Sequence, residues 1–247
     1  MYIIKLHKSH RNIPRIIHQI WSGIEEPLPE FFRELTETWK KHHPDWEYIF
    51  WDNERMNSFI QEFYPEYWTS YNAAKYNIQK WDLIRYLILH HFGGMYVDVD
   101  YECLESFESL LENNKGCYFS AEAAMHANAM GIGNFFNNAL IISIPRHPFV
   151  WLIVESAFNE ISLERNYPSK LFEVLSTTGP LLLTHLYNNH QDNDDIYIIP
   201  SELVAPLNHF DVKKYMAGNN SPSFEIYIQN KLTNALAIHY FAGTWLR

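Results

Sequence analysis

The chain has 247 residues, 47% of them hydrophobic and 19% charged, a composition that can fill the core of one large α/β domain. Its net charge of −10 argues against nucleic acid as a main partner. The two cysteines, Cys103 and Cys117, are too few for a disulfide framework or a zinc ribbon.

The first half of the sequence alternates the patterns of strands and helices. Prolines and polar caps mark the helix ends, and the last helix of this half is apolar almost all round, which predicts that it is buried. The expected elements are a strand over 13–21, a helix from Pro29 to just before Pro44, a strand over 47–52, a helix capped by Asp52 or Asn53 and running to Phe63, and a long helix over 71–91 that ends at Gly93 and Gly94.

The second half is more irregular. Its expected elements are strands over 116–122 and 139–145, a helix over 149–158 after Pro148, a helix with Pro180 in its first turn, and short strands over 196–200, 224–228 and 235–241. The whole pattern predicts an α/β fold with a mainly parallel central sheet and helices on both faces. We expect a single domain over 1–247.

Residues 93–104, GGMYVDVDYECL, place Asp98 and Asp100 in a run that is typical of a buried strand. Residues i and i+2 of a strand point to one face, so the two carboxylates should project together, with Cα atoms roughly 6.6 Å apart. A divalent cation is a natural partner for two adjacent carboxylates. The alternative is a solvated pair, which we expect for the same Asp-x-Asp spelling at 192–194, within the polar run NNHQDNDD.

Asp82 and Arg85 lie three residues apart on one face of the buried helix. This spacing fits an internal salt bridge as well as it fits a functional pair. In the functional interpretation both side chains reach a cleft, where the hydroxyl groups of a ligand bind them.

The N-terminal segment is basic, with Lys5, Lys8, Arg11 and Arg15. It lacks the apolar core of a secretory signal, and no apolar run reaches the ~18 residues of a membrane span. We expect a cytoplasmic protein. Its basic segment is either a solvated tail or a peripheral contact with the inner face of a membrane.

Five strings, in order, resemble a known family: IPRIIHQIWSG, WDLIRYLILHHFGGMYVDVD, FFNNALIISIPRHP, TTGP and IHYFAGTW. They are similar to the glycosyltransferases with a DXD-containing sugar-binding region, the family 32 enzymes. These are related to yeast initiating α-mannosyltransferases and to bacterial capsule and lipopolysaccharide enzymes. The clostridial glucosylating toxins resemble the pattern more distantly. One departure is Trp81, where the family commonly has Ser or Ala before the aspartate.

The resemblance implies a GT-A fold and a retaining transfer of a hexose from a nucleotide sugar to a glycan or lipid-linked acceptor, in surface polysaccharide synthesis. UDP-hexose is preferred over GDP-mannose as the expected donor. Residues from about 13 to 110 would form the nucleotide-sugar-binding half. Residues from about 111 to 247 would form the acceptor side and a closing C-terminal segment. No residue stands out as a covalent nucleophile, so a front-face mechanism is expected.

The resemblance also assigns residue roles. The expected catalytic residues are Asp82, Arg85, Asp98 and Asp100. Asp82 and Arg85 would bind hydroxyls of the donor sugar, Asp98 would contact the sugar or ribose, and Asp100 would bind a divalent metal. His239 would complete the metal site or touch the diphosphate, and Asp98 is expected as a further metal residue. A histidine ligand favours Mn²⁺ over Mg²⁺.

The remaining donor-binding residues implied by the resemblance are Trp21 beside the base, Asn137 and Asn138 in the sugar pocket, and Trp245, which would help close the cleft. Each also has a structural alternative, as a core aromatic or a turn residue. Two rival functions are a non-catalytic glycan-binding protein and a glycoside hydrolase. A hydrolase places two carboxylates on opposite sides of a bond, ~5 to ~9 Å apart, which two aspartates of one strand face do not offer.

Overall fold

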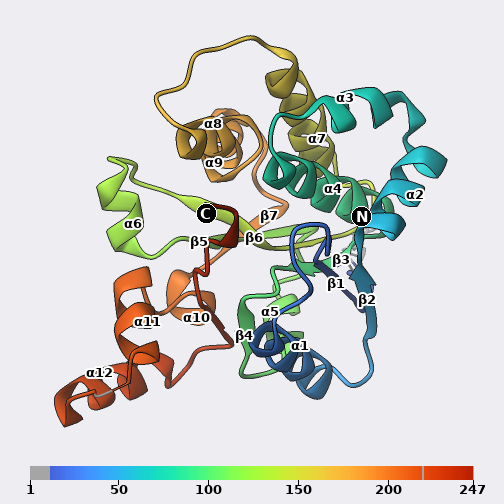
Figure 1. Ribbon diagram of the computed structural model, residues 1–247. Coiled ribbons are helices and arrows are strands. Elements are labelled where there is room, and N and C mark those ends of the chain that lie inside the picture. The colour runs from blue at the N-terminus through green and yellow to red at the C-terminus, as the bar shows by residue number, and fades with distance from the viewer. Residues whose placement is uncertain (1–11, 219, 247) are drawn as a thin grey trace, which may run out of the picture.

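The computed structural model describes residues 12–218 and 220–246. A six-stranded sheet runs through its centre in the order β2-β1-β3-β6-β5-β7 (Figure 1). β1 is parallel to β2 and β3, β5 is parallel to β7, and β6 is antiparallel to both of its neighbours. The mainly parallel sheet is therefore confirmed, with β6 as the exception. The strands are β1 Ile16–Ile20, β2 Glu47–Trp51, β3 Gly94–Val97, β5 Cys117–Ala121, β6 Phe136–Ser143 and β7 Ile196–Ile199.

Helices cover both faces of the sheet, as expected (Figure 1). Side chains alternate between two cores: Tyr96 packs into the core under α4 and α7, whereas Met95 and Val97 pack into the core beside α1 and α5. The first core uses α2 Asn53–Phe63, α4 Asn77–Phe92, α7 Pro148–Ser162 and α9 Pro180–Asn189. The second uses α1 Glu30–His42, α5 Glu108–Leu111 and α10 Ser201–Val204.

Several predicted helix starts are confirmed. Asp52 caps α2 by accepting a hydrogen bond from the backbone N–H of Arg55, and Pro148 and Pro180 open α7 and α9. α1 ends at His42, just before Pro44. The Asp192–Asp194 spelling lies in the loop between α9 and β7, with both aspartates exposed, as predicted.

The single helix predicted over 71–91 is wrong. The chain forms α3 Trp68–Ala73, leaves helical geometry at Ala74, and begins α4 at Asn77. Tyr76 is extended, and the Gln79 side chain accepts its backbone N–H in a capping box. α4 ends at Phe92, and its C-cap Gly93 has a φ of 66°. A Cβ at Gly94 would come within 2.6 Å of the Ile16 carbonyl oxygen, so only glycine allows β3 to lie this close to β1.

The prediction that one strand carries both Asp98 and Asp100 is also wrong. β3 ends at Val97, and residues 98–100 form a turn that the Tyr101 N–H closes on the Asp98 carbonyl at 3.2 Å. The next strand, β4 Tyr101–Cys103, leaves the central sheet and pairs with β8 Ala237–His239 in a separate ribbon. The two aspartates therefore share a turn at the carboxyl end of β3, not one face of a continuous strand.

The short strand predicted over 224–228 is a helix, α12 Pro222–Leu232, which Ser221 caps and Pro222 opens. A run of five residues with four apolar side chains does not distinguish a strand from a helix, and the Ser-Pro start decides here. Five further helices were not predicted: α5 and α10, given above, and α6 Ala124–Ala129, α8 Lys170–Thr177 and α11 His209–Met216. Two 3₁₀ turns, Pro65–Tyr67 and Thr244–Leu246, complete the described elements.

Candidate functional site

A cleft of about 1100 Å³ opens where β1 and β3 end. Its walls come from the end of β1, α4, the 98–100 turn, β6, α8 and the C-terminal segment. This position agrees with the rule that ligands bind beyond the carboxyl ends of strands. All of the site residues predicted from the sequence line it: Trp21, Asp82, Arg85, Asp98, Asp100, Asn137, Asn138, His239 and Trp245.

The Asp82 carboxylate is buried, with 3% of the residue exposed, and protein donors hold both of its oxygens. Oδ1 accepts a hydrogen bond from Asn138 Nδ2 at 2.8 Å and pairs with an Arg85 nitrogen at 3.1 Å. Oδ2 accepts from the Thr178 hydroxyl at 2.8 Å. Burial raises the pKa of Asp82 to about 6, although Arg85 opposes this. The salt bridge considered from the sequence is therefore present, and it lies on the cleft wall.

Arg85 joins three elements. A second guanidinium nitrogen lies 3.2 Å from Asp98 Oδ1 and donates to the Asn138 carbonyl at 2.9 Å, and the group stacks 4.7 Å from the Tyr96 ring centroid. Tyr96 also donates to Asp98 Oδ1. Both contacts fall on that oxygen, and the Asp98 side chain keeps 29% of its surface exposed. Burial raises the pKa of Asp98, against the lowering effect of Arg85.

Asp100 and His239 form a second pair beside the first. His239 Nε2 lies 3.5 Å from Asp100 Oδ1, and the Ala242 N–H donates to Oδ2 at 2.8 Å. Although burial alone would raise it, the histidine and this N–H lower the pKa of Asp100. Although burial opposes its charge, Asp100 raises the pKa of His239. Without a ligand, the two side chains form a buried ion pair.

This pair can hold part of a metal shell. Within the described ranges, no three His, Cys, Asp or Glu side chains are arranged to hold a metal by themselves. Asp100 and His239 offer two ligands, and His239 Nδ1 is buried without a hydrogen-bond partner among the described residues. Cations bound by one or two protein ligands usually complete their shell with substrate phosphates and water. The donor set therefore fits a divalent cation that arrives with a diphosphate.

Asn137 and Asn138 belong to β6, so the alternative of ordinary turn residues is wrong. Asn137 Oδ1 accepts from the Ala139 N–H at 3.2 Å, and the Asn138 side-chain amide also donates to Tyr86 at 2.9 Å. Both are nearly fully buried. In this structure they orient other polar groups of the cleft.

Two half-buried tryptophans lie on the cleft walls. Trp21 follows β1 directly and packs edge-on against Phe32 with ring centroids 5.7 Å apart. Trp245 lies in the C-terminal segment, where its carbonyl accepts a hydrogen bond from Lys170 of α8 at 2.6 Å. Lys170 and the contact between Ala242 and Asp100 tie this segment to both sides of the cleft.

Sequence reasoning missed further lining residues. Lys75 and Tyr76 lie in the break between α3 and α4, Glu122 directly follows β5, and His126 and His209 belong to α6 and α11. The spacing of Glu122 and His126, four residues apart, was a signal for a side-chain pair. Nothing local pointed to His209, because its neighbours in space come from a distant part of the chain.

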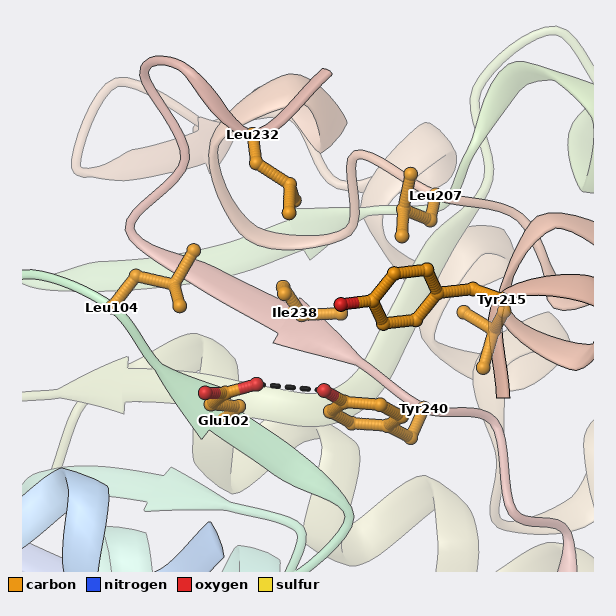
Figure 2. A pocket seen from close by; sticks show the side chains of 8 residues that line it. Glu102, Leu104, Leu207, Tyr215, Leu232, Ile238 and Tyr240 are labelled. Carbon is orange, nitrogen blue, oxygen red and sulfur yellow. Dashed lines mark hydrogen bonds between the residues drawn. The ribbon is translucent and has the colours of Figure 1, made fainter. Parts of the chain in front are cut away.

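A second cavity of about 160 Å³ lies between the β4–β8 ribbon and the helices α11 and α12 (Figure 2). Aliphatic side chains form most of its wall, among them Leu104, Leu207 and Ile238. Its carboxylate, Glu102, already accepts a hydrogen bond from the Tyr240 hydroxyl at 2.7 Å. This cavity lacks the polar groups that a sugar or a diphosphate would need, so the large cleft is the candidate site.

None of the helices within the described ranges has the length and apolarity that a bilayer span requires. Of the basic N-terminal residues, Lys5, Lys8 and Arg11 lie outside the described residues. Arg15 is described, and it pairs with Glu108 at 2.6 Å.

Comparison with known proteins agrees with this geometry. Residues 29–117 match the family described as glycosyltransferase sugar-binding region containing DXD motif. Inositol phosphoceramide mannosyltransferase 1 of Schizosaccharomyces pombe is 30% identical over 196 residues, 77% of this chain and 57% of that one. The uncharacterized glycosyltransferase L373 of Acanthamoeba polyphaga mimivirus is 30% identical over 238 residues, 89% of each chain. The chain spans about half the length of the inositol phosphoceramide mannosyltransferases that it matches.

Solved structures resemble the fold. The PaToxG glycosyltransferase superposes with a TM-score of 0.54 at 17% identity, covering 90% of this chain and 86% of that one. The ligand-free glycosyltransferase domain of the YGT toxin gives 0.52 at 10% identity, covering 90% of each. At these identities the likeness concerns the fold alone, and it confirms the predicted GT-A type of α/β fold. Residues 29–117 match the family, a relative aligns over 89% of its length, and the two aspartates of the motif lie at the cleft. The chain therefore belongs to the family of glycosyltransferases whose sugar-binding region contains a DXD motif.

Proposed function

We propose that the protein transfers a hexose from a nucleotide sugar to a hydroxyl group of a glycan or lipid-linked acceptor, with a divalent cation and with retention of configuration. One observation carries the proposal: the Arg85–Asp98 contact and the Asp100–His239 pair line the same cleft. The first pair offers a fixed donor and an exposed carboxylate, which suits sugar hydroxyls. The second pair offers oxygen and nitrogen ligands, which suits a cation bound to a diphosphate.

A bound cation, held by Asp100 and His239, would neutralise the charge of the leaving diphosphate. The other residues position and shield the donor. Arg85, fixed by Asp82 and the Asn138 carbonyl, presents its guanidinium toward the sugar. Trp21 and Trp245 border the cleft, where they would flank the nucleotide and exclude water.

The engaged carboxylates favour direct transfer over a covalent intermediate. Both oxygens of Asp82 are held by protein donors, so this side chain is a poor nucleophile. Asp98 Oδ1 is shared by Arg85 and Tyr96. In a front-face reaction the acceptor hydroxyl approaches on the side from which the diphosphate leaves, and retention follows without a protein nucleophile.

The relatives' names guide the choice of substrates. Inositol phosphoceramide mannosyltransferases and initiation-specific α-1,6-mannosyltransferases transfer mannose by name. We therefore propose mannose as the first sugar to test and a phosphoinositol lipid as the first acceptor. UDP-hexose as donor, Mn²⁺ as cation and a role in surface polysaccharide synthesis stay predictions.

The test is incubation with UDP- and GDP-sugars, Mn²⁺ or Mg²⁺, and phosphatidylinositol or methyl α-mannoside as acceptor probes. We expect released nucleotide and a glycosylated probe with the donor's anomeric configuration. A glycoside hydrolase would cleave without a nucleotide sugar. A glycan-binding protein would bind a probe and release no nucleotide.

A further inference from the structure

Three polar side chains on the α6–α11 side of the cleft form a hydrogen-bonded chain that the proposed donor chemistry does not use. His126 Nδ1 lies 2.7 Å from a Glu122 carboxylate oxygen, and His126 Nε2 lies 2.8 Å from His209 Nδ1. All three residues line the cleft. The Glu122 side chain is only 9% exposed, so its carboxylate is largely removed from water. The hydrogen bond with His126 offsets much of this loss of solvation.

The direction of these hydrogen bonds follows from the chemistry of their ends. The Glu122 carboxylate only accepts, so His126 Nδ1 carries the hydrogen. The backbone N–H of His209 points at His126 Nε2 at 3.5 Å, which agrees with Nε2 being the acceptor. His209 then donates through Nδ1, and its other ring nitrogen, Nε2, carries a lone pair. Burial and the neighbouring His126 lower the pKa of His209, which keeps this lone pair available near neutral pH.

This chain adjoins the proposed diphosphate site. The Phe241 ring contacts both histidines that flank it, with centroid distances of 4.0 Å to His239 and 4.9 Å to His126. A front-face reaction needs the acceptor hydroxyl on the diphosphate side of the sugar. The groups beside His239 are therefore placed for the acceptor.

We propose that Glu122, His126 and His209 form the acceptor site, with His209 as general base and the other two as positioning residues; this rests on the proposed transferase function. The proton of the acceptor hydroxyl moves to His209 Nε2 as the acceptor oxygen bonds to the anomeric carbon. The bond from that carbon to the diphosphate breaks, and the diphosphate keeps the electron pair. His209 then returns its proton to solvent.

The experiment separates acceptor chemistry from donor chemistry in the full chain. His209→Ala, Glu122→Gln and the control His185→Gln, an exposed histidine of α9 outside the cleft, are compared with the wild type. Transfer to methyl α-mannoside and to phosphatidylinositol is measured alongside nucleotide release to water without acceptor. His209→Ala should lose about 10²–10⁴-fold in kcat/KM for the acceptor, the usual contribution of a general base. Its donor KM should not change, whereas its release to water should also fall, because the same base activates water at the acceptor position.

Two readouts exclude a structural role. Added imidazole should restore part of the transfer by His209→Ala, because it can enter the exposed position, and it should not change the control. Glu122→Gln should lower kcat for the acceptor with an unchanged donor KM and melting temperature. Normal transfer by His209→Ala, or an equally large rise in its donor KM, overturns the assignment. No product from the wild type on either probe contradicts the proposed function and, with it, this site.

A separate observation concerns the outer surface of α11 and α12, which stand at one edge of the molecule away from the central sheet (Figure 1). Five of the eleven exposed large hydrophobic side chains of the described residues belong to these two helices: Phe210, Tyr215, Met216, Ile226 and Tyr227. Such a concentration marks an interaction surface.

The charges on this surface select an anionic partner. Lys213, Lys214 and Lys231 are exposed here, in a chain whose net charge is −10. The acidic side chains of the two helices are Asp211, whose carboxylate accepts hydrogen bonds from Asn208 at 2.6 Å and Tyr227 at 3.1 Å, and the exposed Glu225, so lysines outnumber carboxylates here. Apolar side chains beside lysines fit the interface of a bilayer with anionic head groups. We infer that this surface, defined by α11 and α12, docks onto such a bilayer and brings the cleft to lipid-linked acceptors.

Co-sedimentation with phosphatidylcholine vesicles, with and without phosphatidylserine, tests the docking. The wild type should bind only vesicles that contain phosphatidylserine. The double variant Met216→Ser/Ile226→Ser should lose this binding and keep transfer to methyl α-mannoside, and Leu163→Ser, an exposed apolar position on another part of the surface, should bind normally. Unchanged vesicle binding by the double variant contradicts membrane docking. So does a wild-type dimer in buffer that the double variant no longer forms.

Discussion

The guanidinium of Arg85 lies 3.2 Å from the carboxylate of Asp98, and this contact ties the buried helix α4 to the turn that carries both aspartates of the DXD motif. The same guanidinium lies 3.1 Å from Asp82. The position of the turn therefore depends on an ion-pair network inside the first core as well as on β3.

Arg85→Lys should both destabilise the protein and abolish transfer. A lysine ammonium cannot contact Asp82, Asp98 and the Asn138 carbonyl together, and a broken buried pair typically costs about 3–5 kcal/mol. Urea denaturation and activity per folded molecule measure the two effects. The control is Arg33→Lys, whose exposed pair with Glu30 on α1 should be worth at most about 1 kcal/mol. Equal effects of the two substitutions would contradict the network.

Asp100→Asn should remove the response to metal. One carboxylate fewer leaves the cation and the diphosphate poorly held, and we expect a loss of about 10²–10³-fold in kcat. Asp194→Asn changes the exposed loop aspartate of the other Asp-x-Asp spelling and should have no effect. Titration calorimetry with Mn²⁺ and nucleotide gives the affinity. Full activity of Asp100→Asn, or of the wild type in EDTA, would refute the metal-assisted mechanism.

Metal affinity should also fall as pH falls. In the ligand-free protein Asp100 raises the pKa of His239, so a cation has to displace a proton from this ring before it can bind there. The same calorimetry, repeated in buffers of different ionisation enthalpy, should show proton release on binding. Release of no proton would mean that His239 is not a ligand.

His18 should make the protein less stable in acid. It is buried and neutral, with Nε2 donating to the Gly93 carbonyl at 3.0 Å and Nδ1 accepting from Trp51 at 3.2 Å. Burial lowers its pKa to about 4. Between pH 6.5, the ordinary pKa of histidine, and pH 4, the unfolded chain binds a proton at His18 that the folded protein does not. The stability that neutral His18 contributes is therefore fully present above pH 6.5 and is lost on acidification.

The comparison is with His18→Gln, which can keep both hydrogen bonds and does not titrate. The unfolding free energy of the wild type relative to this variant should be larger at pH 7.5 than at pH 4, by on the order of 3 kcal/mol. Chemical denaturation at both pH values measures it. A difference that is independent of pH would show that His18 is not kept neutral.

Trp245→Ala should weaken donor binding by about tenfold, equivalent to ~1.4 kcal/mol, with little change in melting temperature. The side chain is half-buried on the cleft, and the segment is held by Lys170 and by the contact between Ala242 and Asp100. Deleting residues 242–247 should lower donor affinity further and leave the fold intact. Hydrogen exchange in 240–246 should slow when metal and nucleotide bind. A truncated protein with normal kinetics would show that the segment only packs.

Much of the fold could be predicted from local signals. The strands β1 and β2 follow from β-branched and aromatic runs, α2, α7 and α9 from caps and prolines, and the cleft position from the order of strands and helices. The break at Ala74–Tyr76 could not be predicted, because apolar spacing continues through it. The turn at Asp98–Asp100 was hidden for the same reason: Val99 and Tyr101 are apolar and buried, yet β4 leaves the sheet to pair with β8.

The proposed donor side of the site was predictable to a greater extent than the proposed acceptor side. Asp82, Arg85, Asp98 and Asp100 lie in one continuous stretch with a recognisable spacing. His126 and His209 come together only because α6 and α11 fold onto the same side of the cleft, and no spacing in the sequence records that contact.

The most direct test of the central claim is the release of nucleotide and the formation of glycosylated product with a panel of UDP- and GDP-hexoses, in Mn²⁺ and in EDTA. The account predicts that one donor gives equal amounts of nucleotide and product, that EDTA stops both, and that Asp100→Asn does the same without unfolding. Product formation that is unaffected by EDTA and by Asp100→Asn, or no turnover of any donor by the folded wild type, would contradict it.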